Sequence, residues 1–411
     1  MKRIGLQRMT RNRIFTAIVL GILSESGSMH AAVPMTSIEY RSRHSAEVNA
    51  ECDRRKAEWL EFYTHLHRNP ELSLQEKESA RLVTDRLRAA GFQVTTNVGG
   101  HGVVGVLANG PGPVVLIRGD MDALPVTEET GLPYRSEVKA AGSDGNPVGV
   151  MHACGHDIHQ TCLIGAAQVL TELKKHWRGT VVAVAQPAEE IGVGALAMIK
   201  DGLFERFPKP DVCLSLHVAA DQPAGEIGYT PGWAAANVDS VDITIHGRGG
   251  HGSRPESTID PIVAAAHVIT ALQTIVSRRV PPGEPAVVTV GSIHAGSKHN
   301  IIPDQAALQL TVRSYTEETR RLLLDAIREV TTSTCKAHGC ERDPDVRMRD
   351  GEFTPAGYND PELTEAAGAG FPEIIRSGPC REAEATHGRR GFRPLPQATQ
   401  RSGVYVLARQ R

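Results

Sequence analysis

The sequence HACGHD, residues 152–157, is the stretch around which the rest of the chain is organised. Cys154 and His156 stand two residues apart, a spacing that suits a turn or a strand end and not one face of a helix. Cysteine and neutral histidine are ligands that borderline-soft divalent metal ions prefer. The stretch is therefore either part of a metal site or a buried structural cysteine beside a loop histidine.

Polar side chains that can bind a metal ion follow three predicted strands. They are Asp120 and Asp122 after 114–118, Glu189 and Glu190 after 180–185, and His217 after 212–216. The strands are predicted from their β-branched content, and the continuous apolar run at 180–185 is typical of a buried, largely parallel sheet. Ligands of open α/β sheets bind beyond the carboxyl ends of strands, so we expect these side chains to meet there.

The residue types at these positions indicate a hydrolytic metal site. The donors are sufficient for one or two ions: Cys154, His156, Glu190 and His217. Glu189 adjoins a ligand but points elsewhere on an extended chain, so it can serve as a general base. Asp122 is placed to orient a metal ligand without binding the metal itself.

Each of these residues also has a purely structural interpretation. Glu189 and Glu190 can form a solvated turn, His217 can be a core histidine with satisfied hydrogen bonds, and Asp120 can pair with Arg118. Their joint occurrence after three strands favours the metal site.

Length and composition bound the class of protein. A chain of 411 residues is expected to form two domains. Hydrophobic residues make up 40% and charged residues 22%, as in ordinary globular proteins. The net charge of −2 gives no electrostatic reason to expect nucleic acid as a partner.

Periodicity predicts an α/β first part and a smaller α+β insertion. The predicted helices of the first part are 46–67, 73–90, 157–174 and 194–200, and two further strands are 92–98 and 103–108. From about Gly228 the character changes. Strands at 238–246, 286–293 and 306–314 alternate with helices at 261–277, capped by Asp260, and 317–338.

The first 32 residues have the layout of a secretory signal peptide. Basic residues precede the apolar run 14–23, which is too short to span a bilayer, and small and polar residues follow it. We therefore expect a periplasmic or secreted protein, with a cytoplasmic one as the alternative. We expect no other stretch to be long and apolar enough for a membrane span. The seven cysteines suggest no compact disulfide framework.

Taken together, the motifs resemble the M20 metallopeptidase family, and specifically its amidohydrolase branch, which includes hippurate hydrolases and hydrolases of auxin–amino acid conjugates. The matching motifs are RGDMDALP at 118–125, MHACGHD at 151–157, QPAEE at 186–190 with Gly194-Ala195, Leu216-His217, GGHG at 249–252 with Pro255-Glu256, and NIIPD at 300–304. The resemblance covers roughly residues 50–365.

The resemblance implies a zinc-exopeptidase-like catalytic domain with an inserted ferredoxin-like lid or dimerisation domain. The catalytic domain would comprise 46–227 and a return segment at 339–368, the lid 228–338. The resemblance implies a homodimer formed through the lid. It also implies two divalent ions, Mn²⁺ or Zn²⁺, held by the four donors above, with Glu189 as the base.

The same resemblance places three residues of the insertion near the substrate. His251 and Asn300 would reach toward it from the lid. Arg313 would bind a substrate carboxylate, and its structural alternative is an arginine on a strand surface.

The end of the chain departs from the family pattern. The family has a Gly-Gly-Glu-Asp-Phe-like segment and a last histidine ligand near its end. Residues 369–411 are instead rich in arginine and proline, and their only histidine is His387. We interpret this segment as an aberrant, poorly ordered tail from a shifted reading frame or a truncated gene product.

The predicted function is a metal-dependent amidohydrolase that cleaves N-acyl amino acids, which are small molecules, by means of metal-activated water. Two alternatives stay open. One is an impaired or inactive relative that lacks the last ligand, and the other is a dipeptidase or carboxypeptidase of the same family.

Overall fold

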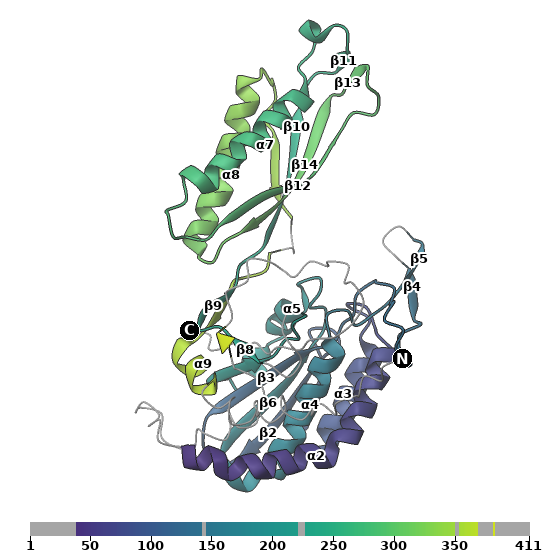
Figure 1. The fold of residues 1–411 in the computed structure, drawn as a ribbon, viewed down its shortest axis with the longest axis vertical. Coiled ribbons are helices and arrows are strands. Elements are labelled where there is room, and N and C mark those ends of the chain that lie inside the picture. The colour runs from purple at the N-terminus through teal and green to yellow at the C-terminus, as the bar shows by residue number, and fades with distance from the viewer. Residues whose placement is uncertain (1–37, 142–144, 221–226, 350–352, 369–380, 383–411) are drawn as a thin grey trace, which may run out of the picture. The chain divides into compact units, whose positions relative to one another are not determined.

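The computed structural model describes residues 38–141, 145–220, 227–349, 353–368 and 381–382. The predicted signal peptide and nearly all of the predicted aberrant tail, including His387, lie outside these residues. Two compact units are present (Figure 1). Within the described residues, the first unit comprises the chain up to Gly232 together with the segment from Tyr358, and the second is Trp233–Gly357.

A five-stranded sheet with the order β1-β2-β6-β3-β7 forms the centre of the first unit. Its strands are β1 (Gln93–Val98), β2 (Gly102–Asn109), β3 (Val114–Asp120), β6 (Gly179–Gln186) and β7 (Val212–Ser215). β3 runs parallel to both β6 and β7, whereas β2 is antiparallel to β1 and β6. The prediction of a largely parallel sheet was wrong for β1 and β2, because a tight turn joins these two strands directly.

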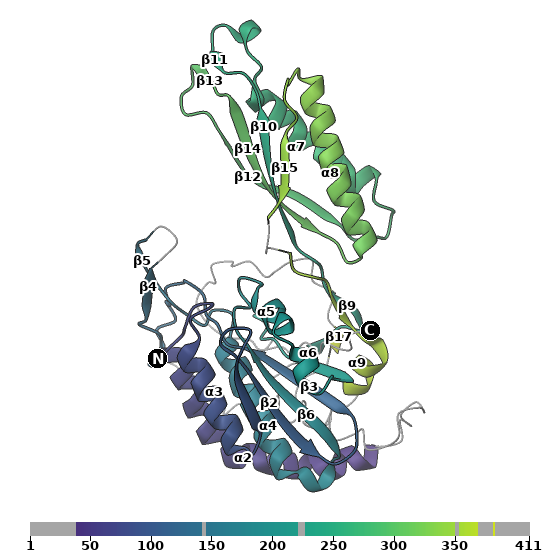
Figure 2. The same ribbon diagram turned by 180° about the vertical axis from the view of Figure 1, so that it is seen from behind.

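Helices cover both faces of this sheet (Figures 1 and 2). One face carries α2 (Ile38–Arg68), α3 (Lys77–Ala89) and α4 (His156–Glu172), and the other α5 (Gly194–Lys200) and α6 (Leu203–Arg206). Alternate residues of β6 explain this layering. Val181 and Ala183 belong to one core, and Val182 packs with Met198 and Leu203 in the other. A strand buried on both faces must be apolar throughout, and the predicted α/β class is confirmed.

Shorter elements complete the first unit and the joins between units. They are β4 (Lys139–Ala141) paired with β5 (Pro147–Gly149), η1 (Lys174–His176), β8 (Gly228–Tyr229) paired with β17 (Arg381–Glu382), β9 (Gly232–Ala235) paired with β16 (Gly357–Asn359), and α9 (Pro361–Gly368). The helix predicted from Ser73 begins only at Lys77. The difference arises because Leu74 has a φ of 68°, a left-handed conformation that a helix cannot contain.

The second unit is a four-stranded antiparallel sheet with the order β12-β14-β10-β15. Its strands are β10 (Asp239–His246), β12 (Val287–Ala295), β14 (Gln305–Arg313) and β15 (Asp345–Met348), and its helices are α7 (Pro261–Arg278) and α8 (Glu317–Ala337). Val241, Ile243 and Ile245 of β10 share one core with both helices, as the predicted alternation requires. The predicted insertion ends at residue 338, but β15 follows that position and still belongs to this sheet, so the second unit extends further along the chain.

The chain continues beyond this sheet into a small two-stranded pair. β11 (Gly250–His251) pairs with β13 (Ile301–Ile302), and η2 (Pro255–Ser257) follows β11.

Helix α7 is long and apolar enough to cross a membrane by length and composition, and it is the one such helix among the described residues. We expected no such stretch from the sequence, and by length and composition alone α7 is one. Ala264, Val268, Leu272 and Ile275 of α7 are fully buried in the core of the second unit. The apolarity of α7 is thus explained by its packing against the sheet.

Replacing Asp260 should destabilise the second unit through the N-terminus of α7. The Asp260 carboxylate accepts hydrogen bonds from the backbone N–H groups of Ile262 at 2.9 Å and Val263 at 3.4 Å. We expect Asp260→Ala to lower the free energy of unfolding of this unit by about 1 kcal/mol. Asp260→Asn is the matched control, because asparagine keeps the accepting oxygen. Denaturant titration followed by hydrogen exchange on α7 measures both, and equal losses in the two variants would contradict the cap.

Candidate metal centre

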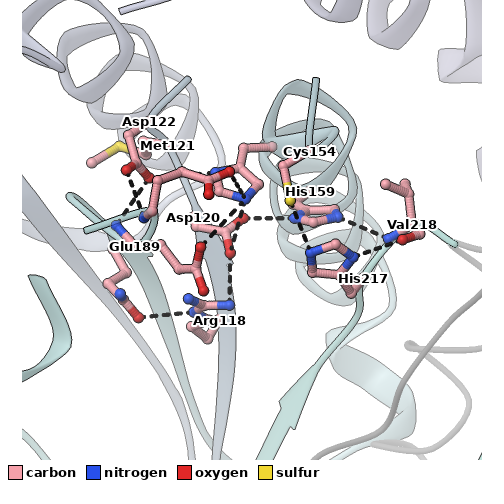
Figure 3. A network of polar contacts seen from close by, with 12 residues as sticks. Arg118, Asp120, Met121, Asp122, Cys154, His159, Glu189, His217 and Val218 are labelled. Atoms are coloured by element: carbon pink, nitrogen blue, oxygen red, sulfur yellow. Dashed lines mark hydrogen bonds and ion pairs between the residues drawn. The ribbon is translucent and has the colours of Figure 1, made fainter. Parts of the chain in front are cut away.

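The predicted site residues of the first unit follow the three parallel strands. Asp120 is the last residue of β3 and lies opposite Gln186, the last residue of β6. His217 comes two residues after β7, which pairs with β3 on its other side. The carboxyl ends of adjacent parallel strands meet at one edge, and the side chains in Figure 3 converge there.

The turn before α4 brings Cys154 against the loop after β7. Gly155 has a φ of 79°, and a Cβ at this position would lie 2.4 Å from Cγ2 of Val218. Both the left-handed backbone and the close approach therefore require glycine. As a result the Sγ of Cys154 lies 3.3 Å from Nε2 of His217 (Figure 3).

The structure gathers the predicted ligands into two overlapping groups. Donor atoms of Cys154, His156 and His217 lie within 4.8 Å of one another, and so do those of His156, Glu189 and Glu190. His156 belongs to both groups. Its Nε2 lies 3.6 Å from Oε1 of Glu190 and 3.8 Å from Oε2 of Glu189.

Unsatisfied buried atoms in these groups fit a bound cation. His156 is fully buried, and neither of its ring nitrogens has a hydrogen-bond partner within the described part of the chain. The same holds for Oε1 of Glu190. Buried polar atoms without partners are costly, and a cation between these lone pairs would satisfy them. The donor chemistry therefore fits a divalent metal ion.

Burial disfavours the charged forms of three of the donors as long as no cation compensates them. It raises the pKa of the Cys154 thiol to about 11 and that of Glu190 to about 7. It lowers the pKa of His217 to about 3, so this imidazole is neutral and can donate a lone pair. A divalent cation favours the thiolate and the carboxylate, and binding would release their protons.

Hydrogen bonds set which nitrogen of His217 is available. Its Nδ1 donates to the backbone oxygen of Val218 at 2.6 Å, which leaves the Nε2 lone pair facing Cys154. His159 is held similarly: its Nε2 accepts from the N–H of Val218 at 3.0 Å, and its Nδ1 donates to Asp120 at 2.6 Å. Partners of this kind orient metal-ligating histidines in proteins.

Asp122 connects several parts of the site. Its carboxylate accepts the backbone N–H groups of Glu189 at 3.0 Å and Glu190 at 2.9 Å, and the hydroxyl of Ser73 at 2.6 Å. Its Oδ1 lies 3.4 Å from Nδ1 of His156. Through these contacts Asp122 would position His156 and the two glutamates together.

The segment that carries Glu189 and Glu190 is a turn, which corrects the prediction of an extended chain. Ala188 has a φ of 47°, and its N–H donates to Oε1 of the buried Glu76 at 2.7 Å. Because the backbone turns here, both glutamate side chains approach His156, and Glu189 does not point away from the ligands.

Two buried histidines, His159 and His67, were not singled out from the sequence, whereas Asp120 was. Asp120 pairs with Arg118 at 2.7 Å, the structural alternative considered for it, and also with His159. His159 was detectable in principle, because it stands three residues after His156 on one face of α4. His67 was not detectable, since its partners Asp157 at 2.6 Å and Glu128 at 3.1 Å are distant in sequence.

The second unit holds the three predicted substrate-binding residues. His251 and Asn300 come together, because β11 pairs with β13 and the N–H of Gly252 donates to the backbone oxygen of Asn300 at 2.9 Å. Nδ1 of His251 accepts from the hydroxyl of Ser253 at 2.7 Å. Arg313 ends β14 and is half-buried. The length of that strand, about 26 Å, separates it from the β13 end, so the unit does not bring Arg313 to the other two.

Comparison with known proteins identifies relatives over most of the chain. The family described as "Peptidase family M20/M25/M40" matches this chain over residues 116–389. The chain is 38% identical to a hippurate hydrolase of Campylobacter jejuni, over 79% of this chain and 81% of that protein. It is also 38% identical to thermostable carboxypeptidase 2 of Saccharolobus solfataricus, over 75% and 76% of the two chains.

A solved structure agrees with these relatives. The Bacillus subtilis YXEP protein, described as a dinuclear metal binding peptidase from the M20 family, is 30% identical with a TM-score of 0.65. The similarity covers 81% of this chain and 83% of that one. The family predicted from the motifs is confirmed.

Asp122→Asn should weaken metal binding without unfolding the protein. The amide has only one accepting oxygen for the three donors that the carboxylate now satisfies. We expect affinity for a divalent ion to fall about 10–100-fold, as measured by competition with a chromophoric chelator. Asp242→Asn is the matched control, because Asp242 pairs with Arg349 at 2.7 Å in the second unit. Unchanged affinity in Asp122→Asn would remove Asp122 from the site.

Proposed function

The chain belongs to peptidase family M20/M25/M40 and hydrolyses amide bonds, and from that premise we propose that it removes the acyl group from N-acyl amino acids with the help of two divalent metal ions. The observation that carries this proposal is the convergence of sulfur, imidazole and carboxylate donors on the buried His156. The hippurate hydrolase among its relatives supports the substrate class. The dinuclear description of the related structure supports the number of ions.

In the proposed mechanism, Cys154, His156, Glu190 and His217 hold the metal ions, and Asp122 and His159 keep the ligands oriented. Divalent ions, when bound, lower the pKa of water and polarise the substrate carbonyl. The contacts of Asp122 and His159 keep the ligand side chains in their orientations. The hydrogen bonds of Asp122 to Glu189 and Glu190 also fix the distance between the base and the ligand next to it in sequence.

Glu189 is the proposed general base. Burial, together with the negative charge of Asp120, raises the pKa of its carboxyl group. A raised pKa makes the carboxylate a stronger base. Glu189 would accept a proton from the attacking water and pass it to the leaving nitrogen, so that the amino acid departs as a neutral amine.

The second unit would complete the site during turnover. Because Nδ1 of His251 accepts from Ser253, its Nε2 is the nitrogen free to donate. We assign that N–H to the developing oxyanion, where one such donor is worth about 10²–10³ in kcat. Asn300 would contact the substrate beside it, whereas Arg313 lies too far along β14 to reach the same small molecule.

The metal is Mn²⁺ or Zn²⁺ in this proposal. A cysteine ligand favours zinc, whereas the carboxylates are equally suited to manganese. Removal of either ion with a chelator should abolish hydrolysis, and the metal that restores it identifies the cofactor.

The protein would act outside the cytoplasm, as a homodimer formed through the second unit. The basic and apolar layout of the first 32 residues supports export. N-terminal sequencing of the protein from cell fractions tests this proposal.

Glu189→Gln and Glu190→Gln should separate catalysis from metal binding. We expect Glu189→Gln to retain both ions and lose about 10²–10⁴ in kcat, because the amide cannot accept the proton. Glu190→Gln should lose metal affinity as well as activity. Metal content by mass spectrometry and kcat measured with N-benzoylglycine decide the matter, and substantial turnover by Glu189→Gln would refute its role.

A substrate panel tests the function as a whole. N-acyl amino acids, dipeptides and longer peptides with a free carboxyl terminus are compared by kcat/KM on the metal-loaded full chain. We expect the N-acyl amino acids to be preferred by at least tenfold. A preference for peptides would favour a peptidase like the related carboxypeptidase, and no hydrolysis of any substrate would indicate an impaired relative.

A further inference from the structure

We propose that Cys335 and Cys340 form a disulfide, which closes the C-terminal turn of α8 covalently when the protein meets a disulfide donor. Both cysteines are free in the structure. They belong to the second unit, and the proposal uses no residue of the metal centre. It therefore stands or falls independently of amide hydrolysis.

The backbone after α8 folds into a Schellman motif. The N–H of Cys340 donates to the carbonyl of Cys335 at 3.0 Å, and the N–H of Gly339 donates to that of Lys336 at 3.0 Å. Gly339 has a φ of 77°, which glycine adopts without strain. In this motif the residues at the two ends of the turn bring their side chains into contact, usually as a hydrophobic pair. Here that pair consists of two cysteines.

Both cysteine side chains pack in the core of the second unit. Cys335 is 1% exposed within the core of the second unit, and Cys340 packs against the same core. The charged atoms of Lys336 and Asp343 lie 3.4 Å apart, so an ion pair links the last turn of α8 to the segment after Cys340.

A disulfide fits this geometry without rearrangement of the fold. It requires Cα atoms less than about 7 Å apart and Cβ atoms that face each other. The backbone hydrogen bond between the same two residues keeps their Cα atoms close, and the turn places both side chains against one core. Bond formation then needs only side-chain rotation, because no helix or strand has to move.

The chemistry is thiol–disulfide exchange with a donor such as oxidised glutathione. Cys340 is the more exposed of the two, so its deprotonated sulfur attacks the donor disulfide, whose S–S bond breaks and releases one donor thiol. Cys335 then gives its proton to solvent, attacks the sulfur of Cys340 and expels the second donor thiol. Two protein thiols and one donor disulfide thus become one protein disulfide and two donor thiols.

Burial explains why the pair stays reduced without a donor. It raises the pKa of the Cys335 thiol to about 12 and also raises that of Cys340. Thiolates are the reactive species, so direct oxidation at neutral pH is slow.

Peptide mapping of the full, metal-loaded chain tests the proposal. The protein is equilibrated in an oxidising glutathione buffer, free thiols are alkylated, and trypsin is added. Trypsin cleaves after Arg328, Lys336 and Arg342, so the two cysteines fall on separate peptides, 329–336 and 337–342. We expect more than half of these peptides to be recovered joined, and to separate on reduction. Recovery as two alkylated peptides, or with glutathione on 337–342 alone, would overturn the proposal.

Cys340→Ser serves as the matched variant because its position is half-buried and tolerates a hydroxyl. Oxidation should raise the thermal midpoint of the second unit in the parent protein, reversibly with reductant, and leave it unchanged in Cys340→Ser. An equal shift in both proteins would show that the effect arises at other cysteines. Cys154 lies on a different tryptic peptide, so oxidation at the metal centre is scored separately.

Discussion

The parallel alignment of β6, β3 and β7 is the constraint on which the site depends. Parallel neighbours end at the same edge, so three loops that are distant in sequence leave the sheet side by side. The turn at Gly155 then presses Cys154 and His156 against the loop after β7. Had any of the three strands been antiparallel to the others, its polar terminus would lie at the opposite edge, and the donors would not share His156.

Electrostatics at this edge explains why the folded chain favours a cation. Burial disfavours the charge of Asp120, but Arg118, His156 and His159 together outweigh that cost, so the pKa of this carboxyl group is well below its usual range. For Glu189 and Glu190 the cost of burial exceeds the attraction of neighbouring positive charge, and the pKa of both is raised. A divalent ion would supply the missing positive charge. Its binding energy would add to the stability of the first unit, as is common where folding creates the site.

Sequence reasoning identified the residues of the site better than their surroundings. The sequence itself shows where strands end and which residue types follow them. It therefore predicted four ligands, and the structure brings them together in two groups that share His156: Cys154, His156, Glu190 and His217. The contacts that support these ligands cannot be predicted from the sequence. Glu76 bonds to Ala188 across 112 residues and His67 to Asp157 across 90, and no local pattern pairs such positions. The left-handed Ala188, which turns Glu189 toward His156, was missed for the same reason.

X-ray absorption spectroscopy of the zinc-loaded full chain tests the central claim most directly. The claim is that a thiolate from the turn before α4 joins histidine and carboxylate ligands on one cation. It predicts a sulfur neighbour at about 2.3 Å from zinc, together with nitrogen and oxygen neighbours at about 2.0–2.2 Å. In Cys154→Ser the sulfur should be lost. A shell without sulfur in the parent protein, or one whose sulfur persists in Cys154→Ser, would contradict the account.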